Sequence, residues 1–268
     1  MGRNNVVCSG CSSYSSDKSL TTLQTNIQQS VSKVSCWLQK WKMTANCMKT
    51  KFMVFTSRGK KVPEIEIRLN DQQILQTHTH KHLGFILNDR LNWNNHIQHI
   101  CTKVNKQIGL LRTLRHFLSP RLLDNVYKTY ILPIFDYGDI VYDPRSTTNV
   151  KKLDKLQQHC LELTSTNITA TPLEKRRLLH QLVFMFKLTN KLTPQHLQNT
   201  RLPTYNELDK RTTRHKHFLE FPRPRTEAMR CSQVYRAAQA WNSAITEQTR
   251  ELKQLKRFRN SAMLDIGL

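Results

Sequence analysis

The sequence predicts an α+β fold that is mostly helical. The first long apolar pattern, over residues 20–41, has the spacing of a helix. Short and partly alternating apolar runs typical of strands follow it, and every later pattern returns to gaps of three and four residues. We therefore expect a small antiparallel sheet that is backed by the first helix, followed by helices alone.

The apolar residues of the first helix form one stripe of about six turns. They are Leu20, Leu23, Ile27, Val31, Val34, Leu38 and Trp41. Three later stretches predict strands: KFMVF (51–55), EIEIRLN (64–70) and HLGFIL (82–87). In the second stretch the apolar residues alternate and share one face, and the NDQQ sequence after it predicts a hairpin turn.

Helical spacing dominates after Trp93. The first of these helices has apolar residues at Ile97, Ile100, Val104, Ile108, Leu111, Leu114 and Leu118. Its other face carries Lys103, Lys106, Arg112 and Arg115. Ser119 and Pro120 predict the start of the next helix, which Pro133 ends or kinks. Helices are also predicted over residues 150–163, from a capping box at Thr171 and Glu174, and from Met229 through Trp241.

Charge is the strongest functional signal of the composition. The 268 residues include 42 Lys and Arg against 19 Asp and Glu, which gives a formal net charge of +23. A small domain needs a net charge of only about 2–8 for solubility. The excess predicts a polyanionic partner, namely RNA, DNA or an RNA–DNA hybrid. There is no apolar run of about 18 residues, so we expect no membrane partner.

The seven Cys residues are an odd number with irregular spacing, and no apolar signal sequence precedes them. We therefore expect reduced thiols in an intracellular protein, with nucleus and cytoplasm both open. Cys8 and Cys11 have the spacing of half a zinc site, but no second pair of ligands follows at a suitable distance. Free thiols are the favoured interpretation of this pair.

Two further groups are candidates for metal binding. His78, His80 and His82 alternate, so on a strand they would share one face, but no carboxylate lies near them in the sequence to orient the imidazoles. Asp136, Asp139 and Asp143 are the closest approach to a carboxylate cluster. We favour an exposed strand face for the histidines and a solvated helix end for the aspartates, and we expect no metal site.

Several segments, taken in order, resemble the C-terminal half of non-LTR (LINE-type, jockey-like) retrotransposon reverse transcriptases. They are NCMKTKFMVF (46–55), HKHLGFILNDRLNWNNHI (80–97), PIFDYGDIVY (133–142), KLDKLQQHCLEL (152–163), RTTRH (211–215) and AAQAWNSA (237–244). The first corresponds to the Asn-x-x-Lys-Thr segment at the end of the palm, here Asn46, Lys49 and Thr50. The second corresponds to the primer grip and the bridge into the thumb, here Lys81, Leu83 and Gly84, then Asp89, Trp93, His96 and Ile97.

The resemblance implies four segments. They are a ragged N-terminal segment (1–18), a palm remnant with the primer-grip strand (19–92), a helical thumb (93–145) and a basic helical C-terminal region (146–268). In a complete enzyme it would place Lys49 near the departing pyrophosphate. Lys81, His82 and Gly84 would hold the primer, with Gly84 either allowing a close approach of nucleic acid or marking a bulge. Trp93 and Ile97 would lock the sheet onto the first thumb helix.

The sequence departs from the family at the catalytic metals. Reverse transcriptases hold two Mg²⁺ ions with palm carboxylates, including an Asp-Asp pair just before the first helix. This sequence contains no Asp-Asp, and Asn4 and Asn5 occupy that region. Asn lacks the negative charge that holds Mg²⁺. We therefore assign no catalytic residue to this chain alone, with Lys49 a candidate only by resemblance.

Three interpretations stay open. The first is a C-terminal fragment of a reverse transcriptase that binds nucleic acid through phosphate contacts at Lys81, His82, Gly84, Lys103, Lys106, Arg112 and Arg115, without polymerase activity or a cofactor of its own. The second is a nucleic-acid-binding protein that the host has retained. The third is a decayed, non-functional reading frame.

Overall fold

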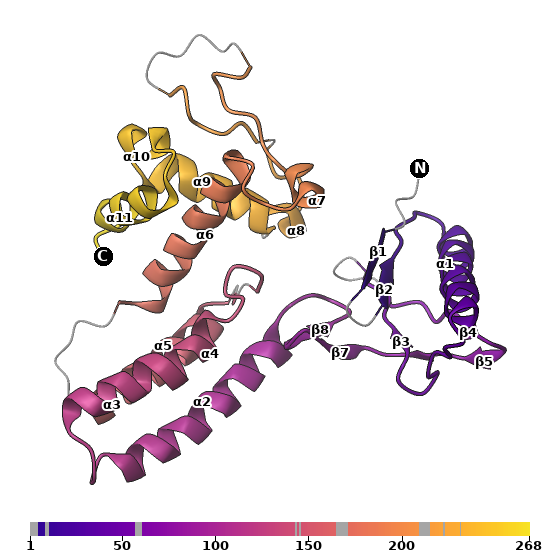
Figure 1. Cartoon of the computed structure of the whole chain (residues 1–268), viewed down its shortest axis with the longest axis horizontal. Helices are drawn as coiled ribbons and strands as arrows, with labels where there is room; N and C mark the ends of the chain where they lie inside the picture. Colours follow the sequence, from indigo (N-terminus) through magenta and orange to yellow (C-terminus); the bar gives the residue numbers. More distant parts are fainter. Residues whose placement is uncertain are drawn as a thin grey trace. The chain divides into compact units, whose positions relative to one another are not determined.

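A computed structural model of the chain describes residues 5–8, 11–56, 61–142, 144, 146–164, 171–208, 215–221, 223–230 and 232–268. The chain divides into two compact units, Met1–Asn95 and His96–Leu268, which are taken separately below. Among the described residues, the first unit holds the strands and one long helix, and the second holds helices and one isolated bridge between Thr204 and Leu219 (Figure 1). The predicted α+β, mostly helical fold is confirmed.

The strands of the first unit pair two by two. They are β1 (Asn5–Cys8), β2 (Cys11–Tyr14), β3 (Lys51–Phe52), β4 (Arg68–Leu69), β5 (Gln72–Gln73), β6 (Leu75–Gln76), β7 (Thr79–His82) and β8 (Phe85–Asn88). Three pairs are antiparallel: β1 with β2, β4 with β5, and β7 with β8. The pair of β3 with β6 is parallel, so the expectation of a purely antiparallel sheet is wrong for this pair.

The alternating EIEIRLN stretch forms the core of this unit, as predicted. Ile65, Ile67 and Leu69 are all buried, together with Val54 and Ile74. The strand-to-strand hydrogen bonding is shorter than the alternating pattern predicts, because only Arg68 and Leu69 of this stretch belong to β4. The reason is that helix α1 (Leu20–Lys40) supplies side-chain amides where a neighbouring strand would supply backbone groups.

Two glutamines of α1 make these contacts. The Gln28 amide both donates to the carbonyl of Arg68 (2.8 Å) and accepts from its N–H (2.9 Å). Gln24 donates to the carbonyl of Glu66 at 2.9 Å. Paired amide contacts of this kind reproduce the hydrogen bonds of a strand edge. They fix α1 against residues 66–68, and Ile27 and Val31 of the same helix pack on the core.

The predicted hairpin at NDQQ is present, with Leu69 opposite Gln72 across the turn. Asn70 and Asp71 have φ values of 49° and 64°. Positive φ at both central residues is the geometry of a type I′ turn, which Asn and Asp tolerate better than most residues. The turn chemistry therefore sets the register that buries the apolar face of β4.

The second unit begins with α2 (Asn94–Leu114), whose buried face contains Ile97, Ile100, Val104, Ile108 and Leu111 as the sequence predicts. Then follow α3 (Pro120–Val126), a π-helical turn η1 (Tyr127–Ile131), α4 (Leu132–Asp136) and α5 (Thr147–Thr164). The kink predicted at Pro133 appears as η1, where the Leu132 N–H donates to the Tyr127 carbonyl five residues back. Proline has no N–H to donate, so the regular hydrogen-bond ladder cannot continue through it.

The remaining helices form the C-terminal part of the second unit. They are α6 (Leu173–Thr189), α7 (Gln195–Gln198), α8 (Glu227–Arg230), α9 (Gln233–Ala244), α10 (Glu247–Glu251) and α11 (Leu255–Asp265). The core lies between α6, α9 and α11, where Trp241 stacks on Phe258 and Phe258 on Phe186, with ring centroids 5.5 and 4.4 Å apart. The capping box predicted at Thr171 is wrong, because Pro172 is the N-cap and makes no side-chain cap.

No helix among the described residues is both long enough and apolar enough to cross a membrane.

Candidate nucleic-acid interface

The β7–β8 hairpin carries the three residues that the resemblance assigns to primer holding. HLGFIL was predicted as one strand, but Leu83 and Gly84 form a two-residue turn that divides it, with φ values of 48° and 84°. Gly84 is therefore a turn residue and does not mark a bulge within a strand. Lys81 and Gly84 are exposed and His82 is half-buried.

Neighbouring residues on a strand point to opposite faces, so Lys81 and His82 do not share one. His82 instead shares a face with His80, and the ring centroids of these two residues lie 6.4 Å apart. The third histidine of the alternation, His78, lies at the other end of the hairpin. Its Nδ1 is 2.9 Å from Oδ2 of Asp89, and the Asp89 N–H donates to the His78 carbonyl at 3.1 Å. The Asp89 carboxylate thus orients the His78 imidazole. The sequence analysis missed this partner because the two residues are far apart in the sequence.

The Asn-x-x-Lys-Thr motif is a capped turn that leads into β3. The carbonyl of Asn46 accepts from the N–H groups of Lys49 (3.1 Å) and Thr50 (3.0 Å), and from the Thr50 hydroxyl at 2.9 Å. The Asn46 side chain also accepts from the Lys49 N–H at 3.1 Å. The spacing of the motif is therefore that of a turn, and the turn holds Lys49 on the surface.

Two of the resembling segments meet inside the second unit. The His96 ring lies edge-on against Tyr142, with centroids 5.0 Å apart, and both side chains are buried. The Tyr142 hydroxyl donates to the carbonyl of Phe135 at 2.8 Å. Burial, together with smaller contributions from nearby His99 and Lys103, lowers the pKa of His96 to about 4. Burial raises the pKa of Tyr142 to about 12. His96 is thus a neutral packing residue.

The four predicted cations are all exposed, as are Lys151, Lys152 and Lys155 of α5. Lys103, Lys106 and Arg112 lie on α2, and Arg115 directly follows it, with its N–H still donating to the carbonyl of Leu111. They do not form one face. At about 100° per residue, the pair Lys103 and Lys106 lies roughly opposite the pair Arg112 and Arg115 around the helix axis. Arg112 points toward α5, because its Nη2 lies 3.2 Å from Nε2 of His159.

That contact connects Arg112 with cations of α5 that the sequence analysis did not select. Lys152, Lys155 and His159 are spaced by three and four residues, so they lie on one face of α5. We call Arg112, Lys152, Lys155 and His159 the α2–α5 ridge. Glu162 is exposed one turn further along that face, and Asp154 lies between the two lysines in the sequence but about 100° or more away from them around the axis of α5. Helical spacing could have grouped the lysines, but only the packing of α5 on α2 adds Arg112.

The predicted solvated acidic helix end is wrong. Asp136 is half-buried and accepts from the Arg176 guanidinium, including Nε at 3.1 Å. Asp139 is 5% exposed, and its Oδ2 lies 2.6 Å from Nδ1 of His180. Asp143 lies outside the described residues. Because α4 and the turn after it face α6, the two carboxylates connect them to Arg176 and His180 of that helix.

These residues do not fit a catalytic pair of metal ions. Asp136, Asp139 and His180 are the one group of potential ligands that comes together in the described part of the chain, within 4.8 Å. The Arg176 guanidinium bound to Asp136 supplies the positive charge that a metal ion would otherwise supply. The backbones of Cys8 and Cys11 face each other across the β1–β2 pair. Their side chains and Asn4 lie outside the described residues, so the structure does not test the zinc and palm interpretations.

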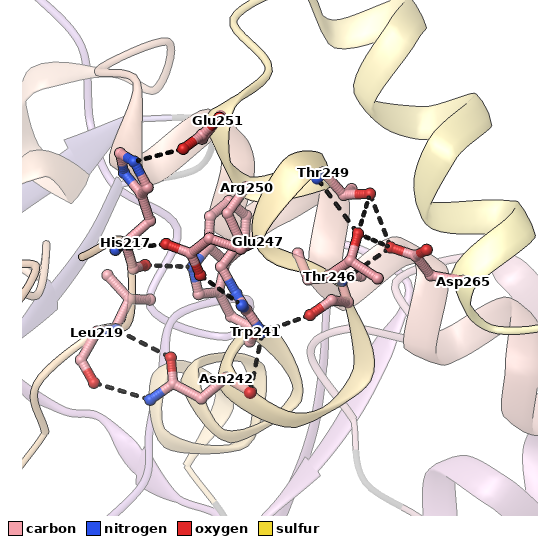
Figure 2. Close-up of polar contacts among 11 residues, drawn as sticks. His217, Leu219, Trp241, Asn242, Thr246, Glu247, Thr249, Arg250, Glu251 and Asp265 are labelled. Carbon is pink, nitrogen blue, oxygen red and sulfur yellow. Dashed lines mark hydrogen bonds and ion pairs between the residues drawn. The ribbon is translucent and has the colours of Figure 1, made fainter. Parts of the chain in front are cut away.

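The AAQAWNSA segment is structural. Trp241 donates from Nε1 to the carbonyl of His217 at 3.0 Å, and the Asn242 amide both donates to and accepts from the backbone of Leu219, each at 2.9 Å. Figure 2 shows Trp241 and Asn242 holding the backbone of His217 and Leu219. The neighbouring RTTRH segment lies outside the described residues except for His215.

Arg250 completes this network (Figure 2). It is buried, and donates to the carbonyls of Trp241 (2.9 Å), Asn242 (2.9 Å) and Ile245, and to Oε2 of Glu247 (2.9 Å). Its guanidinium lies 4.3 Å from the centroid of the Phe218 ring. No local sequence pattern distinguishes Arg250 from the basic residues that follow it, so its burial could not be predicted from the sequence.

Comparison with known proteins finds two similar sequences. The chain is 32% identical over 136 residues to the RNA-directed DNA polymerase from mobile element jockey of Drosophila funebris. The aligned region covers 48% of this chain and 14% of that protein. The chain is 24% identical over 140 residues to the probable RNA-directed DNA polymerase from transposon X-element of Drosophila melanogaster, covering 51% of this chain and 15% of that protein. No family model and no solved structure matches. The match spans about one seventh of each relative, and it confirms the resemblance to part of a non-LTR retrotransposon reverse transcriptase.

Proposed function

We propose that this chain, a partial relative of the non-LTR retrotransposon reverse transcriptases, binds nucleic acid through phosphate contacts and does not polymerise DNA on its own. The observation that carries the proposal is the α2–α5 ridge. Its lysines and Arg112 are exposed and project from two helices that contact each other through the Arg112–His159 hydrogen bond.

The charge of the ridge is available to a ligand. Other cations of the same unit are engaged with the protein: Lys128 pairs with Asp124 at 2.6 Å, and Arg176 pairs with Asp136. Exposed cations on two neighbouring helices can neutralise several phosphates at once, and RNA, DNA and a hybrid all carry those phosphates. Nothing in this arrangement reads base edges, so we expect weak sequence preference.

The hairpin residues Lys81, His82 and Gly84 and the opposite flank of α2 with Lys103 and Lys106 are further candidates. The hairpin belongs to the first unit and has one exposed lysine at its centre. We propose that these residues extend the contact in a longer polymerase, and that the ridge supplies most of the affinity of this chain alone. Lys49 has no chemistry to assist in this chain.

The salt dependence of binding tests the ridge. If about six phosphates are contacted, the logarithm of affinity should fall with the logarithm of salt concentration with a slope of about −5. Replacing Arg112, Lys152 and Lys155 by Ala together should flatten the slope by about two to three units. Fluorescence anisotropy with a labelled hybrid duplex measures both quantities.

The matched control is the triple variant of Lys187, Lys191 and Arg223, which also removes three exposed cations of the second unit. It should change the slope by less than one unit. Equal flattening by both triple variants would show diffuse attraction and would contradict the ridge. Replacing Lys103 and Lys106 by Ala measures what the opposite flank of α2 contributes.

A second experiment tests the absence of polymerisation. We expect no template-dependent primer extension by the purified chain with Mg²⁺ or Mn²⁺. The sequence contains no Asp-Asp, and Asp136 and Asp139 are held by Arg176 and His180. Incorporation of labelled nucleotide above that of a heat-denatured sample, and dependent on the template, would contradict the proposal.

A further inference from the structure

Helix α1 ends in a pair of exposed tryptophans. Trp37 and Trp41 are 49% and 65% exposed, and their ring centroids lie 6.2 Å apart with the rings tilted by 55°. The other two tryptophans of the chain, Trp93 and Trp241, are 9% and 1% exposed. Tryptophan is highly buried on average, so two adjacent exposed rings at one helix end call for a role outside the core.

The backbone around the pair is well defined. Trp41 is the C-cap of α1, the Lys42 N–H donates to the Gln39 carbonyl and the Met43 N–H to the Leu38 carbonyl, both at 2.9 Å. This is the Schellman arrangement of a helix end. The opposite side of the helix is fixed to residues 66–68 by Gln24 and Gln28. The two rings therefore project from a rigid support.

Cations surround the pair. Lys33 precedes Trp37 by four residues and Lys40 follows it by three, so all three lie on one side of α1. Lys33, Lys40 and Lys42 are exposed. Between Asp17 and Glu64 the sequence has nine Lys and Arg residues and no Asp or Glu.

Lys42 places a further cation beside the tryptophans. Its φ is 54°, and this position of a Schellman motif usually holds Gly. A side chain with Cβ in the left-handed region is strained, whereas Gly is not. The chain thus places a cation beside the tryptophans at a position where Gly would be favoured for stability.

We propose that Trp37 and Trp41, with Lys33, Lys40 and Lys42, form a binding site for single-stranded nucleic acid. Aromatic faces stack on bases of any sequence, and lysines between them meet the phosphates. A duplex cannot use this site, because its bases are already stacked on one another. The helix end itself carries partial negative charge, so the lysines alone hold the phosphates. This site is separate from the α2–α5 ridge and does not depend on it.

Intrinsic fluorescence tests the site directly. Oligonucleotides rU12 and dT12 should quench Trp37 and Trp41, while the buried Trp93 and Trp241 keep their emission. Replacing both exposed tryptophans by Leu should remove the quenching and weaken binding of either oligonucleotide by roughly tenfold or more per stacked base. Affinity for a duplex should be unchanged. Comparing rU12 with dT12 shows whether the site prefers RNA.

Two control variants sharpen the test. Phe117→Leu removes a 79% exposed ring from the second unit and should leave the affinity for rU12 and dT12 unchanged. Lys42→Gly should weaken oligonucleotide binding but raise the midpoint of thermal unfolding, because it relieves the left-handed backbone. Unfolding midpoints also verify that the Leu variants are folded.

Three results would overturn the proposal. One is quenching that persists in the double Leu variant. Another is an equal loss of duplex and single-strand affinity, which would show a general charge effect. The third is self-association of the chain that the Leu substitutions abolish without changing oligonucleotide affinity, which would identify a protein contact. Loss of the ridge alone would leave the quenching intact, so the two sites fail independently.

Discussion

Replacing Arg250 by Met is expected to lower the free energy of unfolding of the second unit by about 3–5 kcal/mol. Arg250 is 7% exposed and donates to the carbonyls of Trp241, Asn242 and Ile245 and to Glu247. Methionine fills a similar volume but donates nothing. The variant therefore leaves buried acceptors and the Glu247 carboxylate without their donor.

Urea unfolding followed by tryptophan emission measures the loss, since Trp241 lies in the affected core. Arg250→Lys is the matched control for charge. One ammonium cannot satisfy the divergent carbonyls that a planar guanidinium spans, so we expect it to recover only a minor part of the stability. Glu247→Gln should cost less than Arg250→Met, because the backbone acceptors stay satisfied. A loss below about 1 kcal/mol for Arg250→Met would show that water replaces the guanidinium and would contradict the network.

The sequence predicts well those features that depend on periodicity or turn chemistry. Ile65, Ile67 and Leu69 alternate and are buried, and the apolar stripe of α2 faces the core residue for residue. The Asn70–Asp71 turn follows from residues that tolerate positive φ. Each of these features is determined within a few neighbouring residues, which is the range that local patterns describe.

Local patterns fail where a polar group finds a partner far along the chain. The β7–β8 hairpin separates His78 from Asp89 in the sequence, and helix α5 separates Asp136 from Arg176. The HLGFIL stretch was misread for a different reason. A Leu at the first position of a two-residue turn is unusual, and only the following Gly84 has the residue type that positive φ favours.

The candidate site shows the same division. Exposure of Lys103, Lys106, Arg112 and Arg115 follows from the helical period. Their separation into two flanks also follows from that period, whereas the addition of Lys152 and Lys155 requires the packing of α5 on α2. The resemblance to the family located these motifs. The structure shows that Asn46 and Trp241 make hydrogen bonds to the backbone of neighbouring segments.

The stability of the second unit is expected to fall as the pH falls from about 6.5 toward 4, and His96 is expected to account for about 2–3 kcal/mol of this loss. Burial lowers the pKa of His96 from its ordinary value of 6.5 to about 4. Between these values the unfolded chain binds a proton that the folded chain does not, so acid favours unfolding. Above pH 6.5 both states are neutral, and the contribution vanishes.

The charged and titratable groups around the ring favour the neutral form. His99 and Lys103 of α2 lower the pKa of His96, and the Arg177 guanidinium lies 5.9 Å from the centroid of the Tyr142 ring on which His96 packs. Urea unfolding at pH 7.5 and pH 5 measures the loss. His96→Phe keeps an aromatic edge against Tyr142 but cannot titrate, so its stability should change less between the two pH values than that of the unaltered chain.

His116→Phe, at an exposed position, is the matched control for replacing a histidine by phenylalanine. The remaining histidines are common to all three proteins and cancel in the comparison. The difference between the unaltered chain and His96→Phe therefore isolates the buried ring. Identical pH dependence in these two proteins would mean that His96 takes up its proton in the folded state as readily as in water, and its packing on Tyr142 would then have to be open to solvent.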